Sequence, residues 1–301
     1  MKKRNRISAI FTALILAIVS FCLPCGQVSA VNNNEEIVYN IYSNLRGGTW
    51  KTHYTLNSSP VLTSSGARTV IGTDTRQVDF SKSGVVKIIT SNGFGTGFIV
   101  DGNVIATAAH CVYSKGSAAS YNCGLTIKEI LVFNTDGTVA KRITNNIKEI
   151  HVPQKYISTD GGSNSYDYAL VTVSEDLSDY ANFNLGIMQD NFAQKNTNKA
   201  YTTGFPAEVN NETVNNFTSH KMYTGSGQVL SNQYFDYSRQ FCFNNDITPG
   251  DSGEPVYVET TFDGKTYYTV IGITTASATS CNVANRISPT LLQFYKNNSN
   301  L

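Results

Sequence analysis

Ser252 lies in the segment Gly250-Asp251-Ser252-Gly253-Glu254-Pro255, which predicts a tight turn followed by a short strand over Val256 to Val258. Such a turn would expose one serine hydroxyl. A serine hydroxyl is a weak nucleophile unless a general base lies within hydrogen-bond reach and a third group orients that base. Nucleophilic chemistry at Ser252 would therefore need two further side chains, and the chain upstream holds a candidate for each.

His110 ends the apolar run Thr107-Ala108-Ala109-His110-Cys111, and Asp167 opens another in Tyr166-Asp167-Tyr168-Ala169-Leu170. In this interpretation His110 takes the proton of Ser252, and Asp167 holds the imidazole tautomer and stabilises the imidazolium. Singly, His110 would also fit a buried, hydrogen-bonded histidine, and Asp167 a strand-end cap. The two together with the serine turn favour a catalytic triad, whose oxyanion would accept hydrogen bonds from the N–H groups of Gly250 and Ser252.

These segments, with Val70-Ile71-Gly72-Thr73-Asp74, resemble the chymotrypsin-like serine peptidases, and more closely the secreted bacterial branch that includes the glutamyl endopeptidases. The order His110, Asp167, Ser252 is also the order of that family. The resemblance covers about residues 69–301. It implies an all-β fold of two packed six-stranded antiparallel β-barrels with a short C-terminal helix, and the activity of a serine endopeptidase. An α/β-hydrolase is excluded, because its triad places the histidine last.

The pattern of short β-branched runs with regular turn signals predicts a barrel or sandwich rather than βαβ units. Asp101-Gly102 between two apolar runs predicts a hairpin with a type I′ turn. Ser288 and Pro289 predict the N-cap and first residue of the terminal helix. The expected strands are Val85 to Ile89, Phe94 to Val100, Val104 to Ala106, Ile130 to Phe133, Ile147 to Val152, Ala169 to Val173, Ala200 to Phe205, Gly227 to Leu230, Val256 to Val258 and Tyr267 to Thr275.

The first 68 residues are expected to lie outside the peptidase domain. Basic residues precede an apolar run from Ile7 to Leu23 and a small-residue site ending at Ala30, which predicts a signal peptide over residues 1–30. Residues 31–68 are polar and predict a propeptide that ends near Arg68, or alternatively an N-terminal arm that stays attached. The peptidase domain would then span residues 69–301, and the protein would be secreted to the extracellular space.

Four cysteines remain after removal of the signal peptide, and an even number in an exported chain favours two disulfides. Three pairings are possible. We expect the sequential one, in which Cys111 bonds Cys123 beside His110, and Cys242 bonds Cys281.

The resemblance also points to residues that would shape the pocket for the P1 side chain. The matching positions hold Asp246, Ile247 and the strand residues Thr274, Thr275 and Ser277. Glutamyl endopeptidases usually carry histidine where Thr274 falls and Thr or Ser where Ile247 falls, so their acidic specificity does not carry over. Asp246 would suit Arg or Lys if it pointed into the pocket, but some glutamyl endopeptidases also have an aspartate there, so a structural role stays open. The P1 preference stays open, with basic side chains slightly favoured over Glu.

Cleavage after Arg68 would free an amine at Thr69. In trypsin-like relatives such an amine pairs with the aspartate before the serine, which here is Asp251, and in the glutamyl branch it helps to shape the pocket for the P1 side chain. Bacterial relatives can instead pair that aspartate with an internal arginine, for which Arg239 and Arg286 are the candidates.

The formal charge of +1 shows no basic footprint for nucleic acid or a polybasic membrane surface. No metal cluster, P-loop or dinucleotide fingerprint is visible, so we expect no cofactor and no metal. The expected partners are protein or peptide substrates, with no membrane association after signal removal, and the expected state is a monomer. Two other functions stay open: a catalytically silent homologue acting as a binding module or adhesin, and a toxin-like peptidase of narrow specificity.

Overall fold

The computed structural model describes residues 40–42, 70–113, 127–159, 164–180, 183–188, 191–194, 198–230, 238–262, 265–278 and 281–299. The predicted signal peptide, the cleavage site at Arg68 and Thr69, and Cys123 lie outside the described residues. Of the predicted propeptide, only β1 (Asn40–Tyr42) is described, and it pairs antiparallel with β10. Within the described part, no helix has the length and apolar character needed to cross a membrane.

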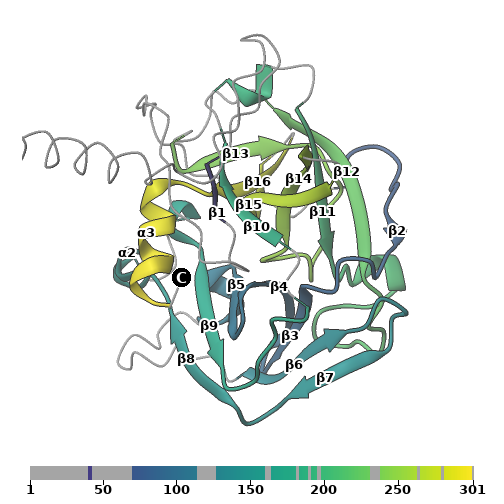
Figure 1. The fold of residues 1–301 in the computed structure, drawn as a ribbon. Helices are drawn as coiled ribbons and strands as arrows, with labels where there is room; N and C mark the ends of the chain where they lie inside the picture. Colours follow the sequence, from purple (N-terminus) through teal and green to yellow (C-terminus); the bar gives the residue numbers. More distant parts are fainter. Residues whose placement is uncertain are drawn as a thin grey trace, which may run out of the picture. The chain divides into compact units, whose positions relative to one another are not determined.

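Strands make up nearly all of the regular structure, as the β-branched runs predict. The first sheet has seven strands in the order β7-β6-β3-β4-β5-β9-β8. These strands are β3 (Val85–Thr90), β4 (Gly93–Asp101), β5 (Val104–Thr107), β6 (Ile127–Phe133), β7 (Val139–Ile143), β8 (Ile147–His151) and β9 (Ala169–Val173). They occupy the lower half of Figure 1, in blue and teal.

The second sheet has nine strands, six of which close into a barrel because β15 pairs with both β14 and β16. The barrel order is β15-β14-β11-β12-β13-β16, and β10 extends it by a parallel pair with β15. Besides β1, the strands of this second sheet are β2 (Gln77–Val78), β10 (Phe183–Ile187), β11 (Lys199–Gly204), β12 (Tyr223–Leu230), β13 (Gln240–Phe243), β14 (Pro255–Phe262), β15 (Lys265–Ala278) and β16 (Cys281–Arg286). The predicted all-β, chymotrypsin-like fold is confirmed, with one closed barrel and one curled seven-stranded sheet.

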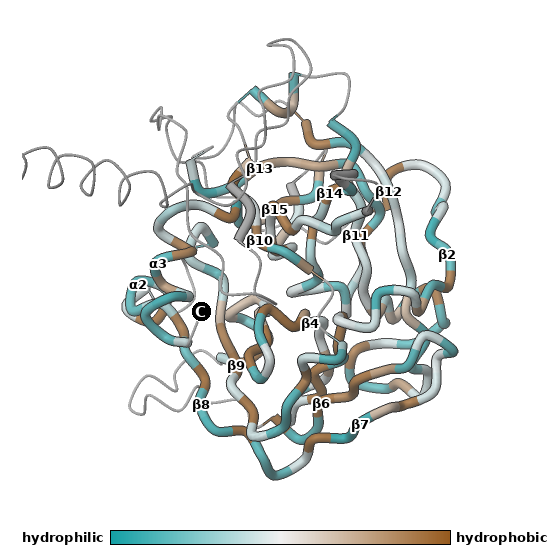
Figure 2. The backbone as a smooth tube through the Cα atoms, viewed as in Figure 1, coloured by the Kyte–Doolittle hydropathy of each residue, from teal (hydrophilic) through white to brown (hydrophobic). Residues whose placement is uncertain are grey.

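One buried apolar cluster joins the two sheets. Phe98 of β4 packs edge to face against Phe183 of β10, with ring centroids 6.0 Å apart, and both side chains are buried. A second cluster lies within the first sheet and a third within the barrel. Figure 2 shows hydrophobic stretches along β4, β6 and β9, which contribute to these clusters. The shared cluster lets the two sheets form one structural unit.

Two short helices complete the described fold, α2 (Gln154–Ser158) and α3 (Pro289–Asn297). The predicted cap of the terminal helix is present: Ser288 Oγ accepts a hydrogen bond from the Leu291 N–H, and Pro289 occupies the first turn. Leu291, Leu292 and Tyr295 of α3 are buried in the shared cluster. Phe294 packs against Tyr168, next to Asp167, with ring centroids 5.2 Å apart.

The hairpin between β4 and β5 forms, but its turn differs from the predicted one. Asp101 pairs with Val104 across the hairpin, so the turn residues are Gly102 and Asn103. Neither is among the residues with positive φ. The type I′ prediction is therefore wrong, because Asp101 stays in the strand.

Candidate active site

The pairing of β5 with β9 brings His110 and Asp167 together. Thr107 at the end of β5 lies opposite Ala169 at the start of β9, and the two strands are antiparallel. The residues that follow β5 and those that precede β9 therefore lie at the same end of the sheet. His110 lies in a 3-10 turn, Ala109–Cys111, and Asp167 follows another, Asn164–Tyr166. The His110 backbone N–H donates to Asp167 Oδ1 at 2.9 Å, and this hydrogen bond connects the two turns.

The serine turn comes from the other sheet and is tied to the first by Thr96 of β4. The Thr96 N–H donates to the Ser252 carbonyl at 2.8 Å, and Thr96 Oγ1 donates to the Gly250 carbonyl at 2.8 Å. Gly253 has φ +84°, and a Cβ there would lie 2.2 Å from the Thr96 carbonyl oxygen. Only glycine allows this close approach of the two backbones.

These contacts bring the three side chains of the predicted triad into line. His110 Nε2 lies 2.5 Å from Ser252 Oγ, and His110 Nδ1 lies 2.7 Å from Asp167 Oδ2. Asp167 is buried, whereas about a third of the His110 side chain is exposed. The geometry is that of a nucleophile, a base and a group that orients the base.

Asp167 also controls the charge of the imidazole. Burial lowers the pKa of His110, but the adjacent negative charge of Asp167 and its hydrogen bond, together with Cys111, outweigh burial, so the pKa lies above the ordinary 6.5. The carboxylate therefore stabilises the imidazolium that proton transfer from Ser252 would create.

The peptide groups of the serine turn leave two N–H groups for an oxyanion. The Pro249 carbonyl accepts from the Ala207 N–H at 2.9 Å, and the Asp251 carbonyl accepts from the Glu254 N–H at 2.9 Å. In a trans peptide the N–H points opposite to the C=O, so the N–H groups of Gly250 and Ser252 face away from these partners. Among the described residues, neither N–H has a backbone acceptor. Gly250 has φ +104°, which this turn requires.

Asp246 does not have the environment expected of a carboxylate that binds a basic side chain. Its Oδ1 accepts from the Ile71 N–H at 2.8 Å, and its Oδ2 accepts from the Thr75 N–H at 3.2 Å. The residue is only 6% exposed. Both carboxylate oxygens thus accept hydrogen bonds from the N-terminal segment 70–76, which favours a structural role for Asp246.

The other predicted pocket residues are buried as well. Ile247 is fully buried in the apolar cluster of the barrel. Thr274 Oγ1 lies 3.4 Å from Glu254 Oε1, and Thr275 Oγ1 donates to the Val283 carbonyl at 3.4 Å. Ser277 is fully buried opposite Asn282 in the pair of β15 with β16. Their role toward a P1 side chain stays a prediction.

The cation beside Asp251 is Arg76, and neither predicted arginine takes that place. Arg76 Nη1 lies 2.6 Å from Asp251 Oδ2, and Arg76 Nη2 lies 2.7 Å from Asp74 Oδ2. Arg286 instead donates to the Met188 carbonyl, and the Arg239 guanidinium lies 4.6 Å from the centre of the Tyr166 ring. The charges of Asp74 and Asp251 raise the pKa of Arg76, against the opposing effect of burial. The signal that was missed is Arg76 itself, two residues after the Val70-to-Asp74 motif.

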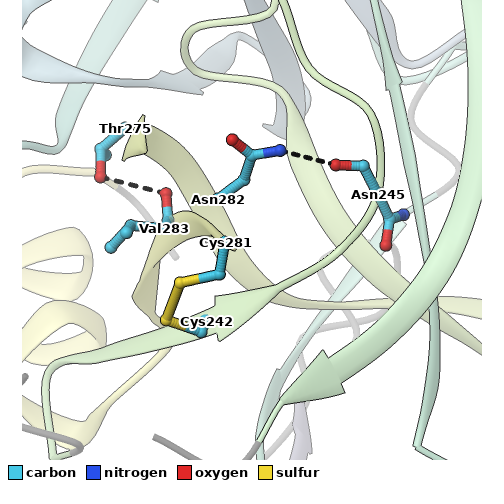
Figure 3. Close-up of a disulfide and its surroundings, with 6 residues drawn as sticks. All are labelled: Cys242, Asn245, Thr275, Cys281, Asn282 and Val283. Carbon is cyan, nitrogen blue, oxygen red and sulfur yellow. Dashed lines mark hydrogen bonds between the residues drawn. A yellow bond between two sulfur atoms is a disulfide. The ribbon is translucent and has the colours of Figure 1, made fainter. Parts of the chain in front are cut away.

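One of the two expected disulfides is present. Cys242 of β13 and Cys281 of β16 are bonded, with Cα atoms 5.7 Å apart (Figure 3). Nearby, Asn282 Nδ2 donates to the Asn245 carbonyl at 2.7 Å. Cys111 differs from the expectation of a bond to Cys123, because it is a free, buried cysteine whose Sγ lies 3.5 Å from the Ser252 carbonyl. Its side chain points inward beside Gly95.

Within the described residues, no group of three or more His, Cys, Asp or Glu side chains could hold a metal ion. The functional residue most clearly missed from the sequence is Thr96. It resembles any strand threonine until the two sheets are packed together.

Comparisons with known proteins agree with this fold. The model of the Trypsin family matches residues 70–296. A solved structure of a Glu endopeptidase in complex with MPD is 18% identical, with a TM-score of 0.59, and the match covers 77% of this chain and 100% of that one. The protease Anisep from Arthrobacter nicotinovorans is 16% identical, with a TM-score of 0.53 and coverage of 75% and 100%. Identities this low show the fold alone. No curated protein matches the sequence.

Proposed function

The chain belongs to the trypsin family of serine endopeptidases, and we propose that it cleaves peptide bonds through His110, Asp167 and Ser252. Its substrates are proteins or peptides. The observation that carries the proposal is the continuous contact from Ser252 Oγ to His110 Nε2 at 2.5 Å and from His110 Nδ1 to Asp167 Oδ2 at 2.7 Å. No part of this relay requires a cofactor.

In the proposed mechanism, Ser252 Oγ attacks the scissile carbonyl while His110 accepts its proton. The carbonyl oxygen becomes an oxyanion that accepts hydrogen bonds from the Gly250 and Ser252 N–H groups. His110 then gives the proton to the leaving amine, and an acyl-enzyme remains on Ser252. Water, activated by the same histidine, releases the acyl group. Asp167 keeps the imidazole oriented and favours its charged form through both steps.

The experiment that tests this function compares wild type with Ser252→Ala on a peptide library read by mass spectrometry. Cleavage by wild type is expected to fall by on the order of 10⁴-fold or more in the variant. A fluorophosphonate probe should label wild type at Ser252 and leave the variant unlabelled. Wild type that neither cleaves nor takes up the probe, after removal of residues up to Arg68, would sink the proposal.

The same library measures the P1 preference. Because both Asp246 oxygens accept hydrogen bonds from backbone N–H groups of residues 71 and 75, the reason for favouring a basic P1 side chain is lost. We therefore propose that Asp246 anchors the N-terminal segment. Asp246→Asn should leave the order of preferred P1 residues unchanged. Selective loss of cleavage after Arg or Lys in that variant would return Asp246 to the pocket.

We further propose that the chain is exported, is trimmed after Ala30 and after Arg68, and acts as an extracellular monomer. The basic start, the apolar run to Leu23 and the small residues before Val31 support export. Since Arg76 already pairs with Asp251, the amine freed at Thr69 is not needed there. A mature form extended by one residue should keep its activity, and N-terminal sequencing of the secreted product locates both cleavages.

A further inference from the structure

Lys87 of β3 is a buried cation that the mechanism above does not use. It is 1% exposed. Its Nζ lies 3.7 Å from the centre of the Phe94 ring and 4.4 Å from that of Phe217, and it donates to the Ser219 carbonyl at 2.8 Å. A buried lysine is costly to a fold unless its charge is compensated. Here aromatic faces and one carbonyl supply that compensation.

A chain of hydrogen bonds leads from Lys87 to the serine turn through the segment that links β11 to β12. The Ser219 N–H donates to Glu212 Oε1 at 2.7 Å, and the Glu212 N–H donates to the Ala207 carbonyl at 3.0 Å. The Ala207 N–H in turn donates to the Pro249 carbonyl at 2.9 Å. That carbonyl belongs to the peptide group whose N–H is the Gly250 donor.

A second, apolar route reaches the same glycine. The Phe94 ring that lies under the ammonium of Lys87 packs directly on Gly250, since a Cβ added there would lie 2.6 Å from Phe94 Cε2. Phe217 packs edge to face on Phe94, with ring centroids 4.5 Å apart. The lysine thus holds both the ring against Gly250 and the segment that orients the Pro249 carbonyl.

The charges around Lys87 agree with a role in holding this segment. Burial lowers the pKa of Lys87 to about 8, while the charge of Glu212 acts in the opposite direction. Partial burial raises the pKa of Glu212, but hydrogen bonds from the N–H groups of Thr218 and Ser219 outweigh it and keep the pKa below its ordinary value. Lys87 therefore binds the Ser219 carbonyl, and the Glu212 carboxylate binds the Ser219 N–H.

We propose that Lys87 is a positioning residue for the oxyanion donor: it clamps the segment 207–220 and Phe94 onto the Pro249–Gly250 peptide and so fixes the direction of the Gly250 N–H. This inference rests on the proposed role of that N–H in catalysis. Lys87 itself does not contact the substrate in this proposal. It acts only through Phe94 and the segment 207–220.

The test replaces Lys87 by methionine, which has a similar length but no charge and no donor. Lys87→Met is expected to lower kcat by about 10- to 100-fold with KM within about twofold, because a displaced donor weakens only the transition state. A peptide boronic acid, whose tetrahedral adduct places an oxygen at the same donors, should lose affinity by a similar factor. Equal kcat in the variant and wild type would overturn the proposal.

Lys82→Met is the matched control. Lys82 is also buried, and its Nζ lies 4.4 Å from the Tyr268 ring centre. Among the described residues it contacts Ser81, Asp79 and Tyr268, not the serine turn. This variant should keep wild-type kcat. If both variants lose kcat equally, general destabilisation explains the loss and the positioning role is wrong. Should Lys87→Met fail to fold, Glu212→Ala breaks the same relay at a half-buried position, and wild-type kcat there overturns the proposal.

A spectroscopic readout separates this inference from the proposed function. Pro249–Gly250 is the one Pro-Gly pair in the sequence, so labelling proline carbonyls with ¹³C and glycine nitrogens with ¹⁵N gives a single correlated amide peak, that of Gly250. This peak should move in Lys87→Met and stay in place in Lys82→Met, whether or not the wild type cleaves peptides. An unmoved peak would refute the positioning role, whereas an inactive wild type would refute only the catalytic proposal.

Discussion

At the scale of single residues, the site depends on side chains and backbone groups that fix one another's direction. The Asp167 carboxylate accepts from both the backbone N–H and Nδ1 of His110, so its two oxygens set the position and the tautomer of the imidazole. Thr96 plays the same part for the serine turn, because its N–H and its hydroxyl bond two different carbonyls of that turn. Each contact removes one rotation that would misplace a reacting atom.

Asp167→Asn tests the electrostatic part of this arrangement. Only neutral His110 can accept the proton of Ser252, so kcat/KM should rise with pH through the pKa of His110, which Asp167 holds above 6.5. Without that carboxylate, burial lowers the pKa of His110 against the opposing effect of Cys111 only, so the midpoint of the acidic limb should fall. The rate should also drop by on the order of 10³- to 10⁴-fold. The measurement is kcat/KM from pH 5 to pH 10.

The matched control is Asp176→Asn. Asp176 is exposed and accepts hydrogen bonds from the N–H and hydroxyl of Ser178, away from the triad. Its pH profile should equal that of wild type. An unchanged acidic midpoint in Asp167→Asn would contradict the assignment of Asp167.

At the scale of elements, the segment before the first sheet braces the walls of the site. Residues 70–78 contact the serine segment at two points: backbone N–H groups of Ile71 and Thr75 bind Asp246, and the Arg76 guanidinium binds Asp251. The last two residues of this segment form β2, which pairs with β12 of the barrel. Order in this segment is therefore coupled to the position of Asp251, directly before Ser252.

Arg76→Gln tests the coupling. The Arg76 and Asp251 side chains are only 3% and 2% exposed, and removal of one partner leaves the other charge buried. The free energy of unfolding should fall by about 3–5 kcal/mol, and kcat/KM by about tenfold or more. Arg76→Lys keeps the charge but loses the forked guanidinium that also binds Asp74. Its stability and its kcat/KM should therefore lie between those of wild type and Arg76→Gln. Thermal unfolding and a peptide substrate give both quantities.

Arg142→Gln provides the comparison, because about half of the Arg142 side chain is exposed in its pair with Glu129. The expected loss there is below about 1 kcal/mol. If Arg76→Gln proved as stable and active as Arg142→Gln, segment 70–78 would have no bracing role.

At the scale of the whole molecule, the site lies where two sheets meet. His110 follows β5 and Asp167 precedes β9 in one sheet, and Ser252 precedes β14 in the other. Neither sheet can form the site alone. The shared cluster, in which Phe98 meets Phe183, is what holds the two halves in register. Loss of that cluster should therefore remove activity and fold together.

Phe98→Ala tests this expectation. The side chain is fully buried, and its truncation should lower the free energy of unfolding by about 3–5 kcal/mol. Urea unfolding followed by circular dichroism and by fluorophosphonate labelling should still give one shared midpoint, shifted to lower urea. Ile105→Ala, in the cluster confined to the first sheet, is the comparison. Labelling that disappears well before the circular dichroism signal in wild type would show that the sheets unfold separately.

The sequence by itself determined the parts that depend on local pattern. Alternating β-branched runs predicted most strands, Ser288 and Pro289 predicted the start of α3, and three short motifs predicted the residues that the structure brings within hydrogen-bond distance. Motif and strand signals can be read locally because they reflect side-chain spacing and backbone preference. Strands β1, β2, β7, β10, β13 and β16 were missed, since their runs are short and less β-branched.

Only the tertiary structure decided which charges meet. From the sequence, Asp246 was a candidate pocket carboxylate. The candidate partners of Asp251 were a new amine, Arg239 and Arg286. Packing instead gave Asp246 to the N–H groups of the N-terminal segment and Asp251 to Arg76, which lies 175 residues earlier in the chain. The roles of Thr96 and Lys87 arose in the same way. A buried ion pair or hydrogen bond depends on which groups lose water together, and strand pairing far along the chain decides that.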